Sequence, residues 1–165
     1  MKIGIIGPSR NWKDKEIIIS KISKIIADTG HEILITADKG SSSEHLAKNF
    51  KESNGKKVYQ IIPEDDEEFG YDWVNINLGE TINCGTWRNQ PEKLNEVSDL
   101  FICIGYSVGT LAEISYSRWF NPKGIEKKQI YIINELISKK LPDEINERLN
   151  INYISWKELK EILES

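Results

Sequence analysis

Residues 99–113 read DLFICIGYSVGTLAE, and this stretch decides the fold. It holds an apolar run of strand length (100–104), a turn with two glycines (105–109) and a helix that opens on Thr110. Such a junction aims backbone N–H groups and the positive end of the helix at one point, which suits a phosphate or another anion. Glu113 would place a carboxylate beside that anion, as a bond-cleaving site could use. The simpler interpretation is a tight turn followed by a solvated first-turn acid.

Strand-like and helix-like patterns alternate along the rest of the chain. Apolar runs predict strands at residues 2–6, 32–36, 57–62, 100–104 and 129–133, with short strands at 74–78 and near Tyr153. Helical spacing predicts helices at residues 14–28, 43–52, 91–97, 110–120, 142–149 and 156–163. We therefore expect an α/β fold, a Rossmann-like three-layer sandwich with a mostly parallel sheet and helices on both faces. The length favours a single nucleotide-binding domain over residues 1–165.

Composition limits the classes of function. Hydrophobic residues make up 39% of the chain and charged residues 29%, as in a soluble globular protein. The formal charge of -4 argues against a nucleic-acid-binding surface, and no apolar run approaches membrane-spanning length. The opening MKIGIIG lacks a signal peptide's apolar core, and Cys84 and Cys103 are widely spaced, so we expect a cytoplasmic protein with reduced thiols. His31 and His45 share no metal-ligand spacing with the cysteines, and we expect neither a metal nor a cofactor.

Three turns follow predicted strands and would meet at one edge of the sheet. The first contains Ser9 and Arg10, a hydroxyl and a guanidinium that suit an anion. The second, ADKGSSS at residues 37–43, is by itself best explained as a helix cap formed by Ser41 or Ser42. The third is the turn at 105–110. Ligands of parallel sheets bind beyond the carboxyl ends of the strands, so these turns predict a nucleotide-sized pocket. Its predicted phosphate ligands are Ser9, Arg10, Gly105, Ser107, Gly109 and Thr110.

At this point the sequence resembles a known family. GYSVGTLAE, residues 105–113, is similar to the GGxxGTxxE signature of the LOG (Lonely Guy) nucleotide phosphoribohydrolases, many of them formerly labelled lysine decarboxylases. That family belongs to a Rossmann-like superfamily that also includes molybdenum-cofactor carriers and DNA-processing proteins. IGIIGPSR at 3–10 resembles its opening strand and phosphate turn, and residues 36–63 resemble its second glycine-rich turn, helix and third strand. Trp87-Arg88-Asn89 resembles an Arg-Asn pair found before the signature strand.

The resemblance implies catalytic roles for Arg88 and Glu113. In the family an Arg and the signature Glu carry hydrolysis of the N-glycosidic bond of a nucleoside 5′-monophosphate. A fixed carboxylate can stabilise the cation-like sugar of that reaction or orient the attacking water. The helix N-terminus would favour ionised Glu113, whereas a bound phosphate would oppose its ionisation. The family is commonly homodimeric, and Tyr116 and Trp119 on the helix after the signature are candidates for the contact.

Two alternatives to the hydrolase stay open. GTLAEISYS, residues 109–117, also resembles the GTxxEIGYA stretch of nucleoside deoxyribosyltransferases. A non-catalytic nucleotide sensor or carrier is favoured by Tyr106 and Asp38, which stand where the family usually has glycine. In each case the expected partner is a nucleotide or a related phosphorylated small molecule. Trp73, Trp87 and Trp119 could stack on a base, although packing is the commoner role of such residues. The segment 63–90 has few regular elements and is long enough to be a functional loop.

Overall fold

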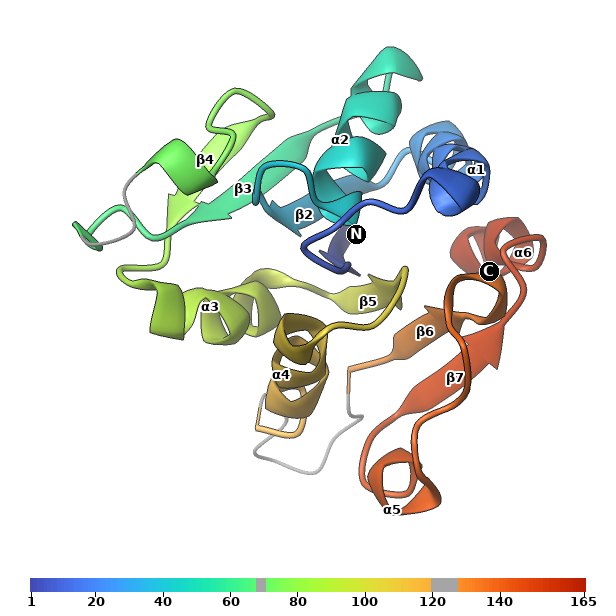
Figure 1. Ribbon diagram of the computed structural model, residues 1–165. Helices are drawn as coiled ribbons and strands as arrows, with labels where there is room; N and C mark the ends of the chain where they lie inside the picture. The colour runs from blue at the N-terminus through green and yellow to red at the C-terminus, as the bar shows by residue number, and fades with distance from the viewer. Residues whose placement is uncertain (68–70, 120–127) are drawn as a thin grey trace.

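The structure, a computed structural model, describes residues 1–67, 71–119 and 128–165. Among these residues, seven strands form one sheet in which every neighbouring pair is parallel (Figure 1). The strands are β1 (Lys2–Ile6), β2 (Glu32–Thr36), β3 (Val58–Ile62), β4 (Glu80–Asn83), β5 (Leu100–Cys103), β6 (Ile130–Ile133) and β7 (Ile151–Ile154). Their order is β4-β3-β2-β1-β5-β6-β7. The chain builds outward from β1 to β4 and then restarts at β5 on the other side of β1, so the topological switch point lies between β1 and β5.

Helices cover both faces of the sheet (Figure 1). On one face lie α1 (Glu16–Asp28), α2 (Ser42–Glu52) and α6 (Leu159–Glu164), and on the other α3 (Gln90–Val97) and α4 (Val108–Tyr116). A short α5 (Asp143–Asn146) and four 3-10 turns complete the described elements: η1 (Lys13–Lys15), η2 (Tyr71–Trp73), η3 (Trp87–Asn89) and η4 (Asn134–Leu136). No helix in these parts of the chain is both long enough and apolar enough to cross a membrane.

The strands are apolar on both sides because each side packs against helices. Ile3 and Ile5 of β1 join the first core cluster with α1, α2 and α6, whereas Ile6 joins the second cluster with α3 and α4. Near-continuous runs of isoleucine, rather than alternation with polar residues, are typical of such doubly covered parallel strands. The α/β fold class and the parallel sheet predicted from the sequence are therefore confirmed.

Most predicted elements exist, and β1 and β2 have the predicted bounds. Helix α4 begins two residues before the predicted start because Ser107, not Gly109, is its N-cap. Its described part ends at Tyr116, and the predicted last residue, Phe120, lies outside the described residues. Helix α6 begins at Leu159 rather than at residue 156, and α5 is shorter than the predicted 142–149.

The predicted strand at 74–78 is wrong. Val74 and Leu78 are buried but Ile76 is exposed, so the three apolar residues do not share one face as they would in a strand, and the backbone makes no ladder there. The buried amide of Gln60 in β3 takes its place, donating to the Ile76 carbonyl at 2.6 Å and accepting from the Leu78 N–H at 3.2 Å. The strand that pairs with β3 is instead the short polar segment Glu80–Asn83, which carries no apolar pattern.

Candidate functional site

The turns after β1 and β5 lie side by side at the switch point. Gly105 has a φ of 144°, and a Cβ added there would lie 3.1 Å from Pro8 Cδ. Only glycine adopts this backbone without strain, and its missing side chain lets the two turns approach each other. A Cβ on Gly7 would likewise lie 2.7 Å from Ser43 Oγ, at the first turn of α2. The carboxyl ends of β1 and β5 and the start of α2 are therefore drawn together at one point.

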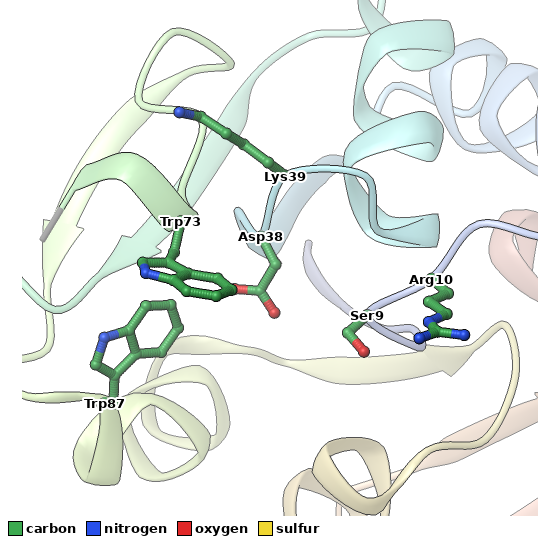
Figure 2. Close-up of a pocket in the computed structure, with 6 residues that line it drawn as sticks. All are labelled: Ser9, Arg10, Asp38, Lys39, Trp73 and Trp87. Atoms are coloured by element: carbon green, nitrogen blue, oxygen red, sulfur yellow. The ribbon is translucent and has the colours of Figure 1, made fainter. Parts of the chain in front are cut away.

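Two adjoining cavities open at this point. The first, which we call the α4 cavity, has a volume of about 460 Å³ and is lined by Gly7, Ser9, Thr36, Asp38, Trp87, Gln90, Pro91, Ser107, Val108, Gly109, Thr110 and Glu113. The second, the tryptophan cavity, has a volume of about 530 Å³ and is lined by Ser9, Arg10, Asp38, Lys39, Trp73 and Trp87 (Figure 2). Ser9, Asp38 and Trp87 line both cavities, so one ligand can extend from one into the other. Each volume lies within the range typical of small-molecule sites.

The N-terminus of α4 presents two free backbone donors to the α4 cavity. Ser107 and Thr110 form a capping box, in which the Ser107 N–H donates to Thr110 Oγ1 at 2.6 Å and the Thr110 N–H donates to Ser107 Oγ at 3.2 Å. The next two N–H groups, of Val108 and Gly109, cannot have intrahelical partners. They donate to no residue that the structure describes, and both residues line the cavity. The positive end of the helix thus faces the cavity with two unused donors.

Glu113 contributes a buried acid to the α4 cavity. Only 7% of the residue is exposed, and its Oε2 atom is buried without a hydrogen-bond partner among the described residues. Asn95 of α3 holds the helix in place by donating from Nδ2 to the Glu113 carbonyl at 2.8 Å. Burial raises the pKa of Glu113 well above its usual range, and the negative charge of Asp38 raises it further. The sequence left the ionisation of Glu113 open, and burial shifts the balance toward its protonated form.

Asp38 lies where the two cavities join, directly after β2. An antiparallel bridge to Val74, with the Lys39 N–H donating to the Trp73 carbonyl at 3.0 Å, fixes the backbone around it. Its Oδ1 atom is buried and accepts no hydrogen bond from the described residues. Burial raises the pKa of Asp38 from 3.8 to about 6, so at neutral pH the group is mostly an ionised carboxylate with an unused acceptor.

Two indole rings form the far wall of the tryptophan cavity. Trp73 on η2 is 66% exposed, and Trp87 on η3 packs partly against the first core cluster (Figure 2). The loop that carries Trp73 is anchored at Asn75, whose N–H donates to the Ala37 carbonyl at 2.8 Å and whose Nδ2 donates to Glu44 Oε1 at 2.7 Å. Trp87 is thus held by core packing, the loop of Trp73 is held by hydrogen bonds, and both residues line the cavity. Trp119, also 68% exposed, lies just beyond the C-terminal end of α4 and lines neither cavity.

The second glycine-rich turn is closed by the protein's own carboxylate. Ser41 caps α2 by accepting from the Glu44 N–H at 3.0 Å, as the sequence predicts. The Glu44 side chain accepts from the Gly40 N–H at 2.8 Å and pairs with Lys48 at 2.9 Å. Burial raises the pKa of Glu44, but the hydrogen bonds from Asn75 and Gly40 and the Lys48 charge outweigh it, and the pKa falls below its usual value. An external anion is therefore not needed at this turn.

The predicted site residues divide into three groups. Ser9, Ser107, Gly109, Thr110 and Glu113 line the α4 cavity together, and Arg10 lines the tryptophan cavity. Gly105 lies behind the cavity wall, where it packs against Pro8. Arg88 is exposed on η3 and lines neither cavity. The Thr110 hydroxyl is already engaged in the capping box, so the free donors of this turn are backbone N–H groups.

The structure places Tyr106 away from the two cavities and adds Val108 to the residues that line one of them. Tyr106 packs into the second core cluster, beside Tyr153, and is absent from the lining of both cavities, so its ring does not obstruct the turn. Val108 was not among the predicted ligands, although the Ser-x-x-Thr spacing of a capping box marks it as the first helical residue. The described residues gather no group of three or more His, Cys, Asp or Glu side chains that could hold a metal ion.

A model of the family described as the SLOG cluster4 family matches residues 1–160 of the chain. Among solved structures, the molybdenum cofactor binding protein from the phototrophic bacterium Rippkaea orientalis has a TM-score of 0.74 and 18% identity, over 98% of this chain and 94% of that one. The Moco carrier protein from Chlamydomonas reinhardtii has a TM-score of 0.77 and 16% identity, with the same coverage of 98% and 94%. The DNA processing protein A from Helicobacter pylori, described by its single-stranded DNA binding, has a TM-score of 0.65 and 12% identity, over 99% and 80%. At these identities the structures share the fold. A search of curated proteins found no match.

Proposed function

Since this chain belongs to the SLOG cluster4 family, a LOG-like group with a Rossmann-like fold, we propose that it binds a nucleotide or a related phosphorylated cofactor in its two adjoining cavities. The observation that carries this proposal is the pair of N–H groups on Val108 and Gly109 that no described residue accepts from, on two residues that line a cavity together with Ser9. Backbone donors at a helix N-terminus recognise phosphate without a lysine or arginine in contact with it. The indoles of Trp73 and Trp87 provide flat apolar surfaces for a ring in the adjoining cavity.

We place a carrier or sensor ahead of a hydrolase. Arg88, which the LOG resemblance implies as catalytic, is exposed and outside both cavities. Burial raises the pKa of Glu113 and so favours its protonated form, which does not offer the negative charge that stabilises a cation-like sugar. It also does not repel a phosphate, which favours binding. Proteins with this fold that are titled molybdenum cofactor carrier or binding proteins support the carrier role.

The second candidate is hydrolysis of the N-glycosidic bond of a nucleoside 5′-monophosphate. It is favoured by Glu113, which lines the α4 cavity, has a raised pKa and has one buried oxygen without a hydrogen-bond partner among the described residues. Such a group could act as a general acid and protonate the departing base. A deoxyribosyltransferase would use the same residue and stays a lesser alternative.

A single pair of assays separates binding from hydrolysis. Thermal unfolding of the full chain is measured with AMP, GMP, CMP, UMP and the corresponding nucleosides, followed by chromatographic detection of released base. The carrier proposal expects at least one monophosphate to raise the melting temperature, since a ligand that binds only the folded state stabilises it. It expects no base release. A protein whose melting temperature responds to none of these ligands, nor to phosphorylated pterins, would refute the binding proposal.

Glu113→Gln decides the enzyme question if base release is seen. The substitution keeps the shape of the side chain and removes the acidic proton. For a hydrolase we expect turnover to fall roughly a hundredfold or more, about 3 kcal/mol of lost transition-state stabilisation. Base release that falls in this way would overturn the non-catalytic proposal. Base release that survives unchanged would instead remove Glu113 from the catalytic assignment.

We propose that two copies of the chain associate along the outer side of α4. Leu111 on this helix is 40% exposed, and Trp119 just beyond it is 68% exposed. Tyr116 lies on the same helix and is partly buried. Exposed aliphatic and aromatic groups on one element are typical of a protein interface. Light scattering at micromolar concentration should give twice the chain mass, and a monomeric mass would refute the dimer.

A further inference from the structure

We propose that Asp38 selects a ring edge with two adjacent N–H donors, the edge that guanine and pterins share, and thereby defines the ligand class of the tryptophan cavity. The inference rests on the proposed function, because it needs a ring between the cavity walls. Asp38 lines both cavities and sits at their junction, between the tryptophans and Ser9 (Figure 2). If the phosphate of a ligand binds at the start of α4 and its ring lies in the tryptophan cavity, the ring lies next to Asp38.

Among the described residues, no donor explains the burial of one oxygen of the Asp38 carboxylate. Its Oδ1 is buried, and no described residue donates to that atom. The described lysines and arginines form no ion pair with it. Figure 2 shows the neighbouring Lys39 side chain directed away from the carboxylate, and Arg10 on the far side of Ser9. A buried acceptor without a donor costs free energy, and a ligand that supplies the donor would remove that cost.

The backbone holds this carboxylate in one place. The residues on both sides of it pair with the Trp73 loop, through the Asp38–Val74 bridge and the Lys39 N–H to Trp73 carbonyl bond of 3.0 Å. The Asp38 carbonyl also accepts from the Ser41 N–H at 3.2 Å. The same pairing fixes the backbone of Trp73, so the acceptor and the residue that carries the stacking surface lie next to each other. A carboxylate beside a stacking surface can accept hydrogen bonds from the edge of a ring that stacks there.

The hydrogen-bonding properties of a carboxylate determine which ring systems it can bind. An ionised carboxylate only accepts hydrogen bonds, and its two oxygens match two parallel donors. Guanine and pterins present such a pair, a ring N–H beside an exocyclic amino group. Adenine presents an amino group beside a bare ring nitrogen, whose lone pair would face a carboxylate oxygen. With the pKa of Asp38 near 6, the ionised form that makes this distinction prevails at neutral pH.

GMP and IMP provide a matched test, because they differ only in the amino group at position 2. Calorimetric titration of the full chain at pH 7.5 should show GMP binding roughly tenfold to hundredfold more tightly than IMP, as expected for a hydrogen bond to a charged group. Asp38→Asn should abolish this preference, since the amide presents one acceptor and one donor. Equal affinities for GMP and IMP, or a preference that persists in Asp38→Asn, would overturn the inference and leave the proposed function intact. Binding of AMP, CMP or UMP without binding of GMP or a phosphorylated pterin would also overturn only the inference, whereas absence of binding by all of these ligands would refute the proposed function itself.

A second comparison distinguishes the two sources of this edge. GTP and dihydroneopterin triphosphate carry the same donor pair and the same number of phosphates. The ligand that binds more tightly identifies the preferred ring as a purine or a pterin. Asp38→Asn should lower the affinity for that ligand roughly tenfold or more. If Asp38→Asn weakens neither, the carboxylate does not read the ring edge and the inference fails.

Discussion

Val108→Pro is expected to weaken binding of a nucleoside 5′-monophosphate roughly tenfold to hundredfold, because it deletes one hydrogen bond to a charged group worth about 1.5–3 kcal/mol. Proline is well tolerated at the first position of a helix, where its missing N–H has no intrahelical partner. The preceding Ser107 has an extended backbone, with φ -152° and ψ 175°, which the residue before a proline favours. Affinity should therefore fall without loss of the fold. Calorimetric titration gives the affinity, and circular dichroism and thermal unfolding verify the fold.

Val108→Ala is the matched control for this substitution. It removes nearly the same side-chain surface, which is 88% exposed, but keeps the N–H group. We expect Val108→Ala to bind as the unmodified protein does, so that only the backbone donor separates the two variants. Equal binding by Val108→Pro and Val108→Ala would show that the α4 N-terminus does not hold the phosphate.

Asp38→Asn is expected to stabilise the ligand-free protein at pH 7.5. The pKa of Asp38 is about 6 in the folded state against 3.8 ordinarily, so the folded state holds the proton more tightly than the unfolded state. Its contribution to stability is therefore unfavourable above pH 6 and is relieved as the pH falls through 6 toward 4. The shift corresponds to a penalty of about 1–3 kcal/mol at pH 7.5, or roughly 3–9 °C in melting temperature.

The difference in stability between Asp38→Asn and the unmodified protein, measured at several pH values, reports on the Asp38 carboxyl group alone. Other acids, such as Glu44 with its lowered pKa, favour stability at higher pH in both proteins and cancel in the comparison. The advantage of Asp38→Asn should be largest near pH 7.5 and shrink toward pH 5, as measured by thermal unfolding at each pH. A variant less stable than the unmodified protein throughout this range would show that Asp38 serves the fold. A gain in stability combined with a loss of GMP affinity is the pattern of a residue kept for function.

The general location of the site could be predicted from the sequence because it depends on local patterns. An apolar strand followed by a small-residue turn and a helix places Ser9, Gly109 and Thr110 at the carboxyl edge of a parallel sheet whatever the rest of the chain does. These residues and Glu113 do line one cavity. The short strand β4 escaped prediction because its sequence ETIN has no apolar pattern, and its pairing depends on the distant β3.

The properties of individual side chains depended on distant contacts and could not be predicted. Asp38 stands where the resembled family usually has glycine, and only the fold shows that burial raises its pKa and that no described residue donates to its Oδ1 atom. Tyr106 also stands at a family glycine, and its ring packs against the second core cluster with Tyr153, which is 47 residues later in the chain. Arg88 matched the family pattern, yet the η3 turn leaves it exposed outside the cavities. The capping box of α4 was readable in principle, since Ser107 and Thr110 have its spacing.

The location of the phosphate tests the central claim most directly. In a two-dimensional ¹⁵N–¹H spectrum of the labelled protein, titrated to saturation with GMP, the amide signals of Val108 and Gly109 should show the largest shifts. They should move to lower field, as N–H groups do when they donate to a charged oxygen, and they should shift less with guanosine. If calorimetry shows GMP bound while both amide signals stay in place, the ligand occupies another site and the N-terminus of α4 does not bind the phosphate.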